Sequence, residues 1–337
     1  LELTVRRELE NAELRQRNAF YRRQLASRRP GPLLGVSPPM QALFELIEAV
    51  APTDATVLIQ GESGTGKEMV AQAIHEASPR AGRELVTVDC GTLQETLFES
   101  EIFGHERGAF TGADRQKKGL VEEAGGSTLF LDEIGETTPA NQAKLLRLLE
   151  TGTFRRLGGT KSLHGDARFV VASNRDLADL SKSGNFRSDL YFRLESFVIK
   201  VPPLRERRED IPLLAQHFLQ RFARGIEREL SADALRLLTA YDWPGNVREL
   251  RNVVERAVIL AGRERRVRSE HFAALSGRRE AAVMLAFDRE PTLSEIEKDY
   301  LRRTLQRYSG NRAKAATVLG ISERNIYRLI KEYGLGD

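Results

Sequence analysis

The stretch that most constrains the fold of this chain is 61–68, which reads GESGTGKE. A short β-branched apolar run at 55–60 precedes it, and apolar residues recur at helical spacing from Met69 to Ala77. This pattern predicts a strand, a glycine-rich loop and a helix, the local structure of a phosphate-binding P-loop. Glycines allow successive backbone N–H groups to face an anion, and Lys67 is placed to meet the outer phosphates.

The loop departs from the usual P-loop pattern at one position. Ser or Thr normally follows the lysine because its hydroxyl holds magnesium, but this chain has Glu68. A chance glycine-rich turn therefore stays as the alternative, although the predicted strand and helix on either side favour a nucleotide site. The residues expected to bind nucleotide are Gly61, Glu62, Ser63, Gly64, Thr65, Gly66, Lys67 and Glu68.

Length and composition narrow the class of protein. The 337 residues are enough for two or three domains, and no apolar run approaches the roughly 18 residues of a membrane span, so no membrane partner is expected. The single Cys90 cannot form an intramolecular disulfide and the five histidines lack zinc-site spacing. We expect no secretory leader and a cytoplasmic location. A pI of about 9.2 is compatible with binding to nucleic acid.

The first 29 residues are rich in Glu, Arg, Leu and Gln and contain no Gly or Pro, which favours one long charged helix. Leu14, Tyr21 and Leu25 lie near heptad positions, but Arg7 and Asn18 interrupt the seam. Two interpretations therefore stay open for 1–29, a short dimerising coiled coil and a solvated linker helix. Because the sequence begins with Leu rather than Met, we expect a fragment whose upstream domain is missing.

From residue 33 onward, predicted strands and helices alternate, which predicts a parallel sheet with helices on both faces. The expected strands are 55–60, 84–90, 127–132, 168–173 and 197–201. Helical periodicity then runs from Ile211 to Leu260, and three further helices follow Pro291. The expected parts are an α/β subdomain at 33–205, a helical subdomain at 206–275, a linker at 276–290 and a small all-α domain at 291–337.

Two carboxylates follow an apolar strand. The run STLFL at 127–131 ends in Asp132 and Glu133, and an alternating fold would place both opposite the P-loop. One acid would then hold magnesium and the other would orient a hydrolytic water. A strand followed by a polar turn is the alternative, which the upstream P-loop pattern disfavours. Asn174 ends the next strand, where it would either read the γ-phosphate or form a turn.

The segment 105–118 carries an aromatic residue on a loop bounded by glycines. Phe110 lies between Gly108 and Gly112, and local turn chemistry does not explain an aromatic side chain there. Two interpretations stay open: either Phe110 packs on its own domain, or it exposes an apolar contact for a partner.

Six motifs in one uninterrupted order resemble the central domain of bacterial sigma-54-dependent transcriptional activators, which are AAA+ ATPases. The resemblance covers about residues 34 to 275 and implies a P-loop α/β fold with a C-terminal helical lid. The family also has a glutamate after the P-loop lysine, so Glu68 agrees with the resemblance. The motifs are GESGTGKE at 61–68, GAFTGA at 108–113, GGSTLFLDEIGE at 125–136, FRSDLYFRL at 186–194, PPLRER at 202–207 and WPGNVREL at 243–250.

The resemblance implies ATP and magnesium as cofactors, and it assigns roles to matched residues. Lys67 would bind phosphate, Asp132 would hold magnesium through water, and Glu133 would polarise the attacking water. Asn174 matches the first sensor of the family, and Arg248, in the lid, matches the second.

Two further arginines and one loop gain roles from the resemblance. Arg187 and Arg193 match arginines that reach into the site of a neighbouring subunit, where a guanidinium neutralises charge on the transferred phosphoryl group. The family's contact to sigma-54 would be made by the loop residues Gly108, Ala109, Phe110, Thr111, Gly112 and Ala113.

Asp89 departs from the family pattern. The family more often has Asn at this strand end, where its amide holds the catalytic glutamate away from water. A carboxylate facing Glu133 cannot donate a hydrogen bond unless one of the two acids is protonated. We therefore expect ATPase activity but draw no switch mechanism through Asp89.

The last helices, within NRAKAATVLGISERNIYRLIKEYGL at 311–335, resemble the Fis-type helix-turn-helix of the same family. Small residues allow close helix packing, Gly320 permits the turn, and Ser322 can cap the last helix. The residues expected to contact DNA are Ser322, Arg324, Asn325, Arg328 and Lys331. The alternative is a small helical dimerisation bundle.

Together these features predict a homo-oligomer, from dimer to hexamer or heptamer, that binds double-stranded enhancer DNA and uses ATP to remodel the sigma-54 RNA polymerase holoenzyme. An upstream receiver domain would place it in a two-component system. One alternative is a DNA-binding regulator whose ATPase core is vestigial, against which the acidic pair and the two arginines argue. Another alternative is a different AAA+ remodeller, such as a loader or an unfoldase, and the GAFTGA loop argues against it.

Overall fold

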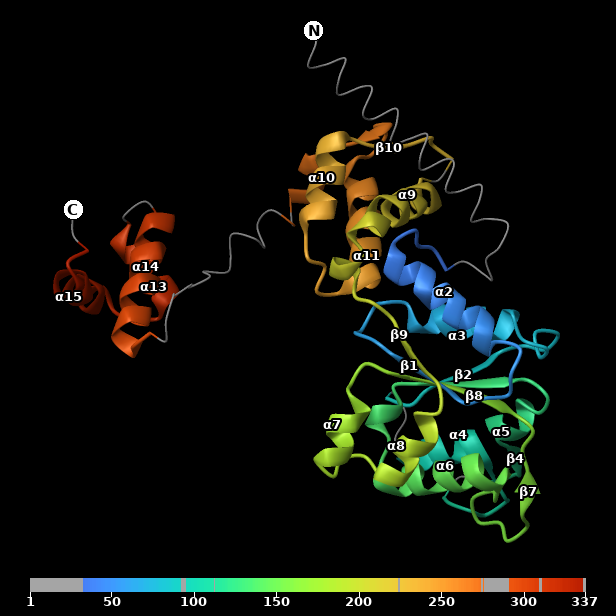
Figure 1. The fold of residues 1–337 in the computed structure, drawn as a ribbon. Helices are drawn as coiled ribbons and strands as arrows, with labels where there is room; N and C mark the ends of the chain where they lie inside the picture. The colour runs from blue at the N-terminus through green and yellow to red at the C-terminus, as the bar shows by residue number, and fades with distance from the viewer. Residues whose placement is uncertain are drawn as a thin grey trace. The chain divides into compact units, whose positions relative to one another are not determined.

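The computed structural model describes residues 33–91, 95–111, 113–223, 225–273, 275, 291–308 and 311–335. The helix predicted at 1–29, the linker at 276–290 and the loop residue Gly112 lie outside the described residues. The chain forms two compact units, one ending at His271 and the other beginning at Phe272 (Figure 1). None of the described helices is both long enough and apolar enough to cross a bilayer.

A five-stranded parallel sheet forms the centre of the first unit, with strand order β2-β5-β8-β1-β9. Successive side chains point to opposite faces, so Leu58 packs on one side of the sheet while Val57 and Ile59 pack on the other. All five predicted strands are present, each within two residues of the expected bounds. They are β1 Val57–Gln60, β2 Val86–Asp89, β5 Thr128–Asp132, β8 Arg168–Ser173 and β9 Val198–Lys200.

Helices cover both faces of the sheet (Figure 1). On one face lie α2 Pro38–Val50, whose apolar residues recur at helical spacing, and α3 Lys67–Glu76. The helices of the opposite face are α4 Glu95–Phe103, α5 Leu120–Glu123, α6 Pro139–Thr151, α7 Leu177–Lys182 and α8 Ser188–Leu194. Between β5 and α6 lies a short helix, η1 Ile134–Glu136.

Two small hairpins that were not predicted from sequence begin directly after helices α4 and α6. Antiparallel β3 Gly104–His105 and β4 Lys117–Lys118 close the base of the GAFTGA loop. The second hairpin pairs β6 Thr153–Phe154 with β7 Leu163–His164. His105 forms a bridge with Leu157, which joins the two hairpins.

The lid follows β9 through a connector, defined here as residues 202–210. The connector contains η2 Leu204–Glu206 and η3 Arg208–Asp210. The lid helices are α9 Ile211–Phe222, α10 Ala232–Ala240 and α11 Asn246–Leu260. A two-residue parallel pair, β10 Glu229–Leu230 with β11 Arg266–Val267, adds strand structure that helical periodicity did not predict, and η4 Ser269–Phe272 follows it.

The second unit contains α13 Leu293–Arg307, α14 Arg312–Leu319 and α15 Glu323–Tyr333. Each begins at a polar cap, because Thr292, Asn311 and Ser322 accept a backbone N–H from the first turn of their helix. Gly320 adopts φ 67° after α14, which produces the predicted tight turn. The core consists of Leu301, Ala315, Ala316, Ile326, Leu329 and Ile330.

Candidate functional site

The P-loop connects β1 to α3 as predicted. Gly64 and Gly66 adopt φ of 78° and 105°, values that L-residues with a side chain rarely reach. Lys67 is 8% exposed, and its ammonium donates to the carbonyls of Gly61 at 2.9 Å and Glu62 at 3.2 Å. A buried ammonium beside a loop that opens the N-terminus of a helix forms a site suited to phosphate.

Opposing effects act on the Lys67 ammonium. Burial lowers the pKa of Lys67, while the nearby carboxylates of Asp132 and Glu133 raise it and Arg248 lowers it. The lysine therefore shares one electrostatic environment with the acidic pair from β5 and with the arginine from the lid. These are the groups that the sequence analysis predicted to act together.

Three carboxylates gather at the C-terminal edge of the sheet. Asp89 pairs in register with Asp132 on the neighbouring strand. Glu133 follows with φ 55°, a strained value for a residue other than glycine, and its N–H donates to Asp132 Oδ1 at 2.9 Å. Burial and then these three acids raise the pKa of the Cys90 thiol.

Gly91 brings the acid cluster close to the backbone. A Cβ built on Gly91 would lie 2.6 Å from Glu133 Oε2 and 3.4 Å from Asp89 Oδ1. Asp89 Oδ1 also accepts the Gly91 N–H at 2.9 Å. The Asp89 carboxylate thus lies on the same side of the strand end as the Glu133 carboxylate, with the Gly91 backbone next to both.

The remaining predicted ATPase residues lie on neighbouring elements. Asn174 follows β8 directly and is exposed. Arg187 forms an ion pair with Asp189 at 2.8 Å, which raises the pKa of Arg187, and Arg193 donates to the Leu149 carbonyl at 2.9 Å. Each arginine thus has a hydrogen-bond partner within its own chain.

Sequence reasoning missed three residues that bind the P-loop from outside it. Arg205, in the connector, forms an ion pair with Glu62 at 2.6 Å. Asn246, at the start of α11, donates to the Glu62 carboxylate at 3.1 Å, and Arg207 donates to the Thr65 carbonyl at 2.8 Å. The motifs PPLRER and WPGNVREL pointed to these segments, but their spacing gave no sign of the contact partners.

The predicted partner loop is tied to its own domain at the base. His105 stacks edge-on against Phe110 with ring centroids 5.1 Å apart, and Phe110 is still 36% exposed. Arg156, from the second hairpin, pairs with Glu106 at 3.0 Å and with Glu122 at 2.6 Å, and it lowers the pKa of Glu122. The Phe110 ring therefore packs on its own domain and also faces solvent, and its contact with a partner stays a prediction.

On the C-terminal unit, the residues predicted to contact DNA lie on or beside α15. Arg324 and Lys331 are exposed, while Ser322 caps the helix. Arg328 donates to Asn325 Oδ1 at 3.1 Å and pairs with Glu332. These side chains form a polar face of α15, and their contact with DNA stays a prediction.

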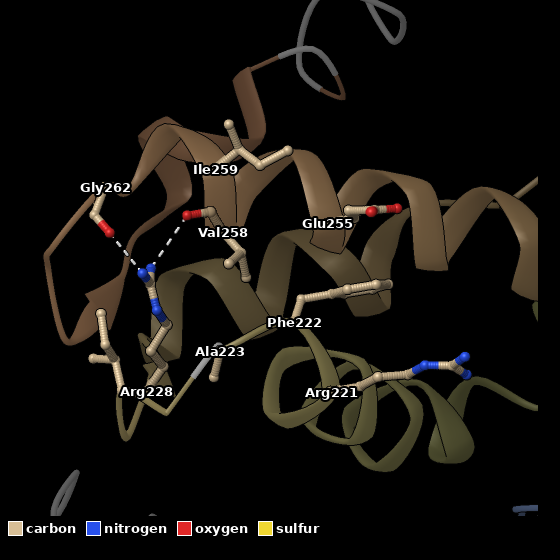
Figure 2. A pocket seen from close by; sticks show the side chains of 9 residues that line it. Arg221, Phe222, Ala223, Arg228, Glu255, Val258, Ile259 and Gly262 are labelled. Atoms are coloured by element: carbon tan, nitrogen blue, oxygen red, sulfur yellow. Dashed lines mark hydrogen bonds between the residues drawn. The ribbon is translucent and has the colours of Figure 1, made fainter.

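A separate pocket of about 350 Å³ lies in the lid, and the predicted nucleotide residues are not part of it (Figure 2). Arg228 is buried there and donates to the carbonyls of Val258 at 3.2 Å and Gly262 at 2.6 Å. These bonds satisfy carbonyls near the end of α11, which is a structural role. The lining residues are Arg221, Phe222, Ala223, Ile226, Arg228, Glu255, Val258, Ile259 and Gly262.

Comparison with known families gives three consecutive matches. Residues 33–200 match the sigma-54 interaction domain, residues 205–286 match the AAA+ ATPase lid domain, and residues 292–333 match the Fis family of bacterial regulatory proteins. The matches follow the order of the α/β, lid and C-terminal parts.

Two curated relatives illustrate the similarity. The transcriptional regulatory protein ZraR of Salmonella typhimurium is 46% identical over 298 residues, which cover 87% of this chain and 67% of ZraR. The nitrogen fixation protein AnfA of Azotobacter vinelandii is 44% identical over 340 residues, covering 99% of this chain and 64% of AnfA. The chain thus spans about two thirds of the length of these relatives.

Solved structures of a related protein contain nucleotide. NtrX from Brucella abortus in complex with ADP is 35% identical, with a TM-score of 0.68, and the match covers 98% of this chain and 75% of that one. The complex of the same protein with ATP gives 36% identity and a TM-score of 0.67.

Proposed function

The chain belongs to the bacterial sigma-54-dependent transcriptional activators, and we propose that it hydrolyses ATP at sites shared between neighbouring subunits of a homo-oligomeric ring. The AAA+ domain makes it an ATPase, and the Fis-type unit makes it a DNA-binding regulator. One observation supports ATP hydrolysis above all: the charges of Asp132, Glu133 and Arg248 all act on the Lys67 ammonium, which donates to a P-loop carbonyl at 2.9 Å.

In the proposed mechanism the P-loop N–H groups and Lys67 bind the phosphates of ATP. Glu133 orients a water and takes its proton as the water oxygen bonds to the γ-phosphorus, while the bond to the β-phosphate oxygen breaks and ADP leaves. Asp132 would hold magnesium through water, and the ion would neutralise phosphate charge. Asn174 and Arg248 would sense the nucleotide.

Arg187 and Arg193 would complete the site of the adjacent subunit. Each would exchange its present partner, Asp189 or the Leu149 carbonyl, for the transferred phosphoryl group. Oligomer formation, with hexamers or heptamers as the active rings, would therefore be required for rapid hydrolysis. The Phe110 loop would contact sigma-54 and transmit the cycle of ATP binding and hydrolysis to it. Helix α15 would bind the ring to double-stranded enhancer DNA, and both contacts would take place in the cytoplasm.

Two measurements test this proposal. Lys67→Ala should abolish ATP hydrolysis, because the charge that faces the phosphates is lost, and an unchanged rate would contradict the enzymatic role. Native mass measurement, with an ATP transition-state analogue and with sigma-54 in one arm, should show a ring that binds sigma-54. A ring that forms without sigma-54 binding would favour a different AAA+ remodeller.

A further inference from the structure

Four consecutive P-loop residues, 62–65, are hydrogen-bonded from the connector or from the first turn of α11. The strongest contact is at Glu62, whose two carboxylate oxygens accept Arg205 Nη2 at 2.6 Å and Nη1 at 2.8 Å. Asn246 Nδ2 adds a third donor to the same carboxylate at 3.1 Å. A fork-to-fork pair of this kind fixes direction as well as distance.

Asn246 joins three segments at once. Its side chain is fully buried, donating to the Ser63 carbonyl at 3.1 Å and accepting the Leu204 N–H at 2.8 Å. Its backbone has φ 53°, which is costly for a residue other than glycine and persists only when surrounding bonds determine it. The P-loop, the connector and α11 therefore meet on one amide.

The next two loop residues are held through the backbone. The Arg248 N–H donates to the Gly64 carbonyl at 3.2 Å, and Arg207 donates to the Thr65 carbonyl at 2.8 Å. A Cβ on Gly64 would lie 2.5 Å from the Gly245 carbonyl oxygen, so the lid backbone approaches the loop as closely as glycine allows. A shift of the lid must therefore move the loop.

The ion pair between Glu62 and Arg205 affects the charge of the P-loop more than the stability of the fold. The hydrogen bonds from Arg205 and then Asn246 lower the pKa of Glu62 to about 2, so the carboxylate is ionised at neutral pH. Its side chain is 42% exposed and that of Arg205 is 41% exposed, and such pairs add little stability. An unpaired negative charge in this loop would, however, oppose the phosphates of ATP.

We propose that Glu62, Arg205 and Asn246 form a positioning cluster, which cancels the charge of the P-loop glutamate and transmits the orientation of the lid to the phosphate-binding loop. This inference rests on the proposed function of the P-loop site in ATP hydrolysis. None of the three side chains needs to touch ATP, because each acts through the loop.

The test measures KM and kcat for ATP, the affinity for a fluorescent ATP analogue, and the melting temperature of the full chain. Arg205→Ala should raise KM and weaken affinity about tenfold with little change in melting temperature, because Glu62 is left unpaired. Adding Glu62→Gln to Arg205→Ala should restore affinity to within about threefold of the parent, since the uncompensated charge is gone. A purely structural contact would give no such rescue.

Asn246→Gly separates coupling from charge. Glycine keeps the left-handed backbone but removes the three side-chain hydrogen bonds, so kcat should fall about tenfold while KM changes less. The matched control is Arg265→Ala, which removes a lid ion pair of 3.0 Å whose partner Glu227 is 88% exposed. This variant should match the parent.

Three outcomes overturn the inference: Arg205→Ala binds ATP within twofold of the parent, Glu62→Gln fails to rescue it, or Asn246→Gly keeps full kcat. Failure of the proposed function looks different, because the parent itself would then hydrolyse no ATP. The affinity measurement still decides the charge step in that case, since it needs no turnover.

Discussion

At the level of single residues, Gly91 lies close to Glu133, the carboxylate that we propose as the general base. A methyl group there would lie 2.6 Å from Glu133 Oε2, so Gly91→Ala should displace that carboxylate. The displaced atom ends a flexible side chain, and we therefore expect the melting temperature to stay nearly constant. The kcat for ATP should fall about a hundredfold, the usual effect of a misplaced general base, with KM little changed.

Gly82→Ala provides the control for that measurement, because its added Cβ would meet nothing within 4 Å. Steady-state phosphate release on both variants separates the two cases. If Gly91→Ala kept the parental kcat, the carboxylate of Glu133 would not act from the position it has in this structure.

At the level of elements, Asp210 links the start of the lid to the start of α2. The carboxylate is fully buried and accepts the N–H groups of Val36 at 2.5 Å and Ser37 at 2.8 Å, as well as the Ser37 hydroxyl at 2.8 Å. Burial lowers the pKa of Arg207, and the Asp210 carboxylate opposes that shift. Asp210→Ala would leave these three donors without their acceptor and would remove the negative charge that compensates buried Arg207.

We expect Asp210→Ala to lower the free energy of unfolding by about 3 kcal/mol, as measured by urea denaturation. Asp210→Asn should cost less, because its amide oxygen still accepts hydrogen bonds. Glu227→Gln, at an exposed carboxylate, is the control. An equal and small effect of all three changes would show that the buried carboxylate does not hold α2.

The elements also show what sequence could and could not predict. Strands β1 and β8 were predictable because each contains a run of apolar residues that ends at a polar residue. The hairpins around Leu157 were not, because two-residue strands have no periodicity. The contact between Glu62 and Asn246 spans 184 residues of sequence, so no local pattern could predict it. Asn tolerates positive φ, so the residue type fits the observed backbone at Asn246 but does not identify its partners.

At the level of the whole molecule, the C-terminal unit has its own small core, separate from the ATPase core. Small units bury little apolar surface, so one overpacked position can unfold them. Ala315 is fully buried in that core, whereas Ala313 is exposed on the same helix. Ala315→Leu should therefore abolish binding to a labelled DNA duplex at low salt, while Ala313→Leu should leave it unchanged.

The same Ala315→Leu protein should keep the parental KM for ATP and the melting transition of the first unit, because the P-loop, the acidic edge and the lid belong to that unit. Fluorescence anisotropy with DNA and steady-state ATP hydrolysis on one preparation test both statements. Parallel loss of DNA binding and ATP affinity would mean that the two units fold as one. Loss of DNA binding alone would establish that enhancer recognition and ATP hydrolysis rest on separately stable parts of the chain.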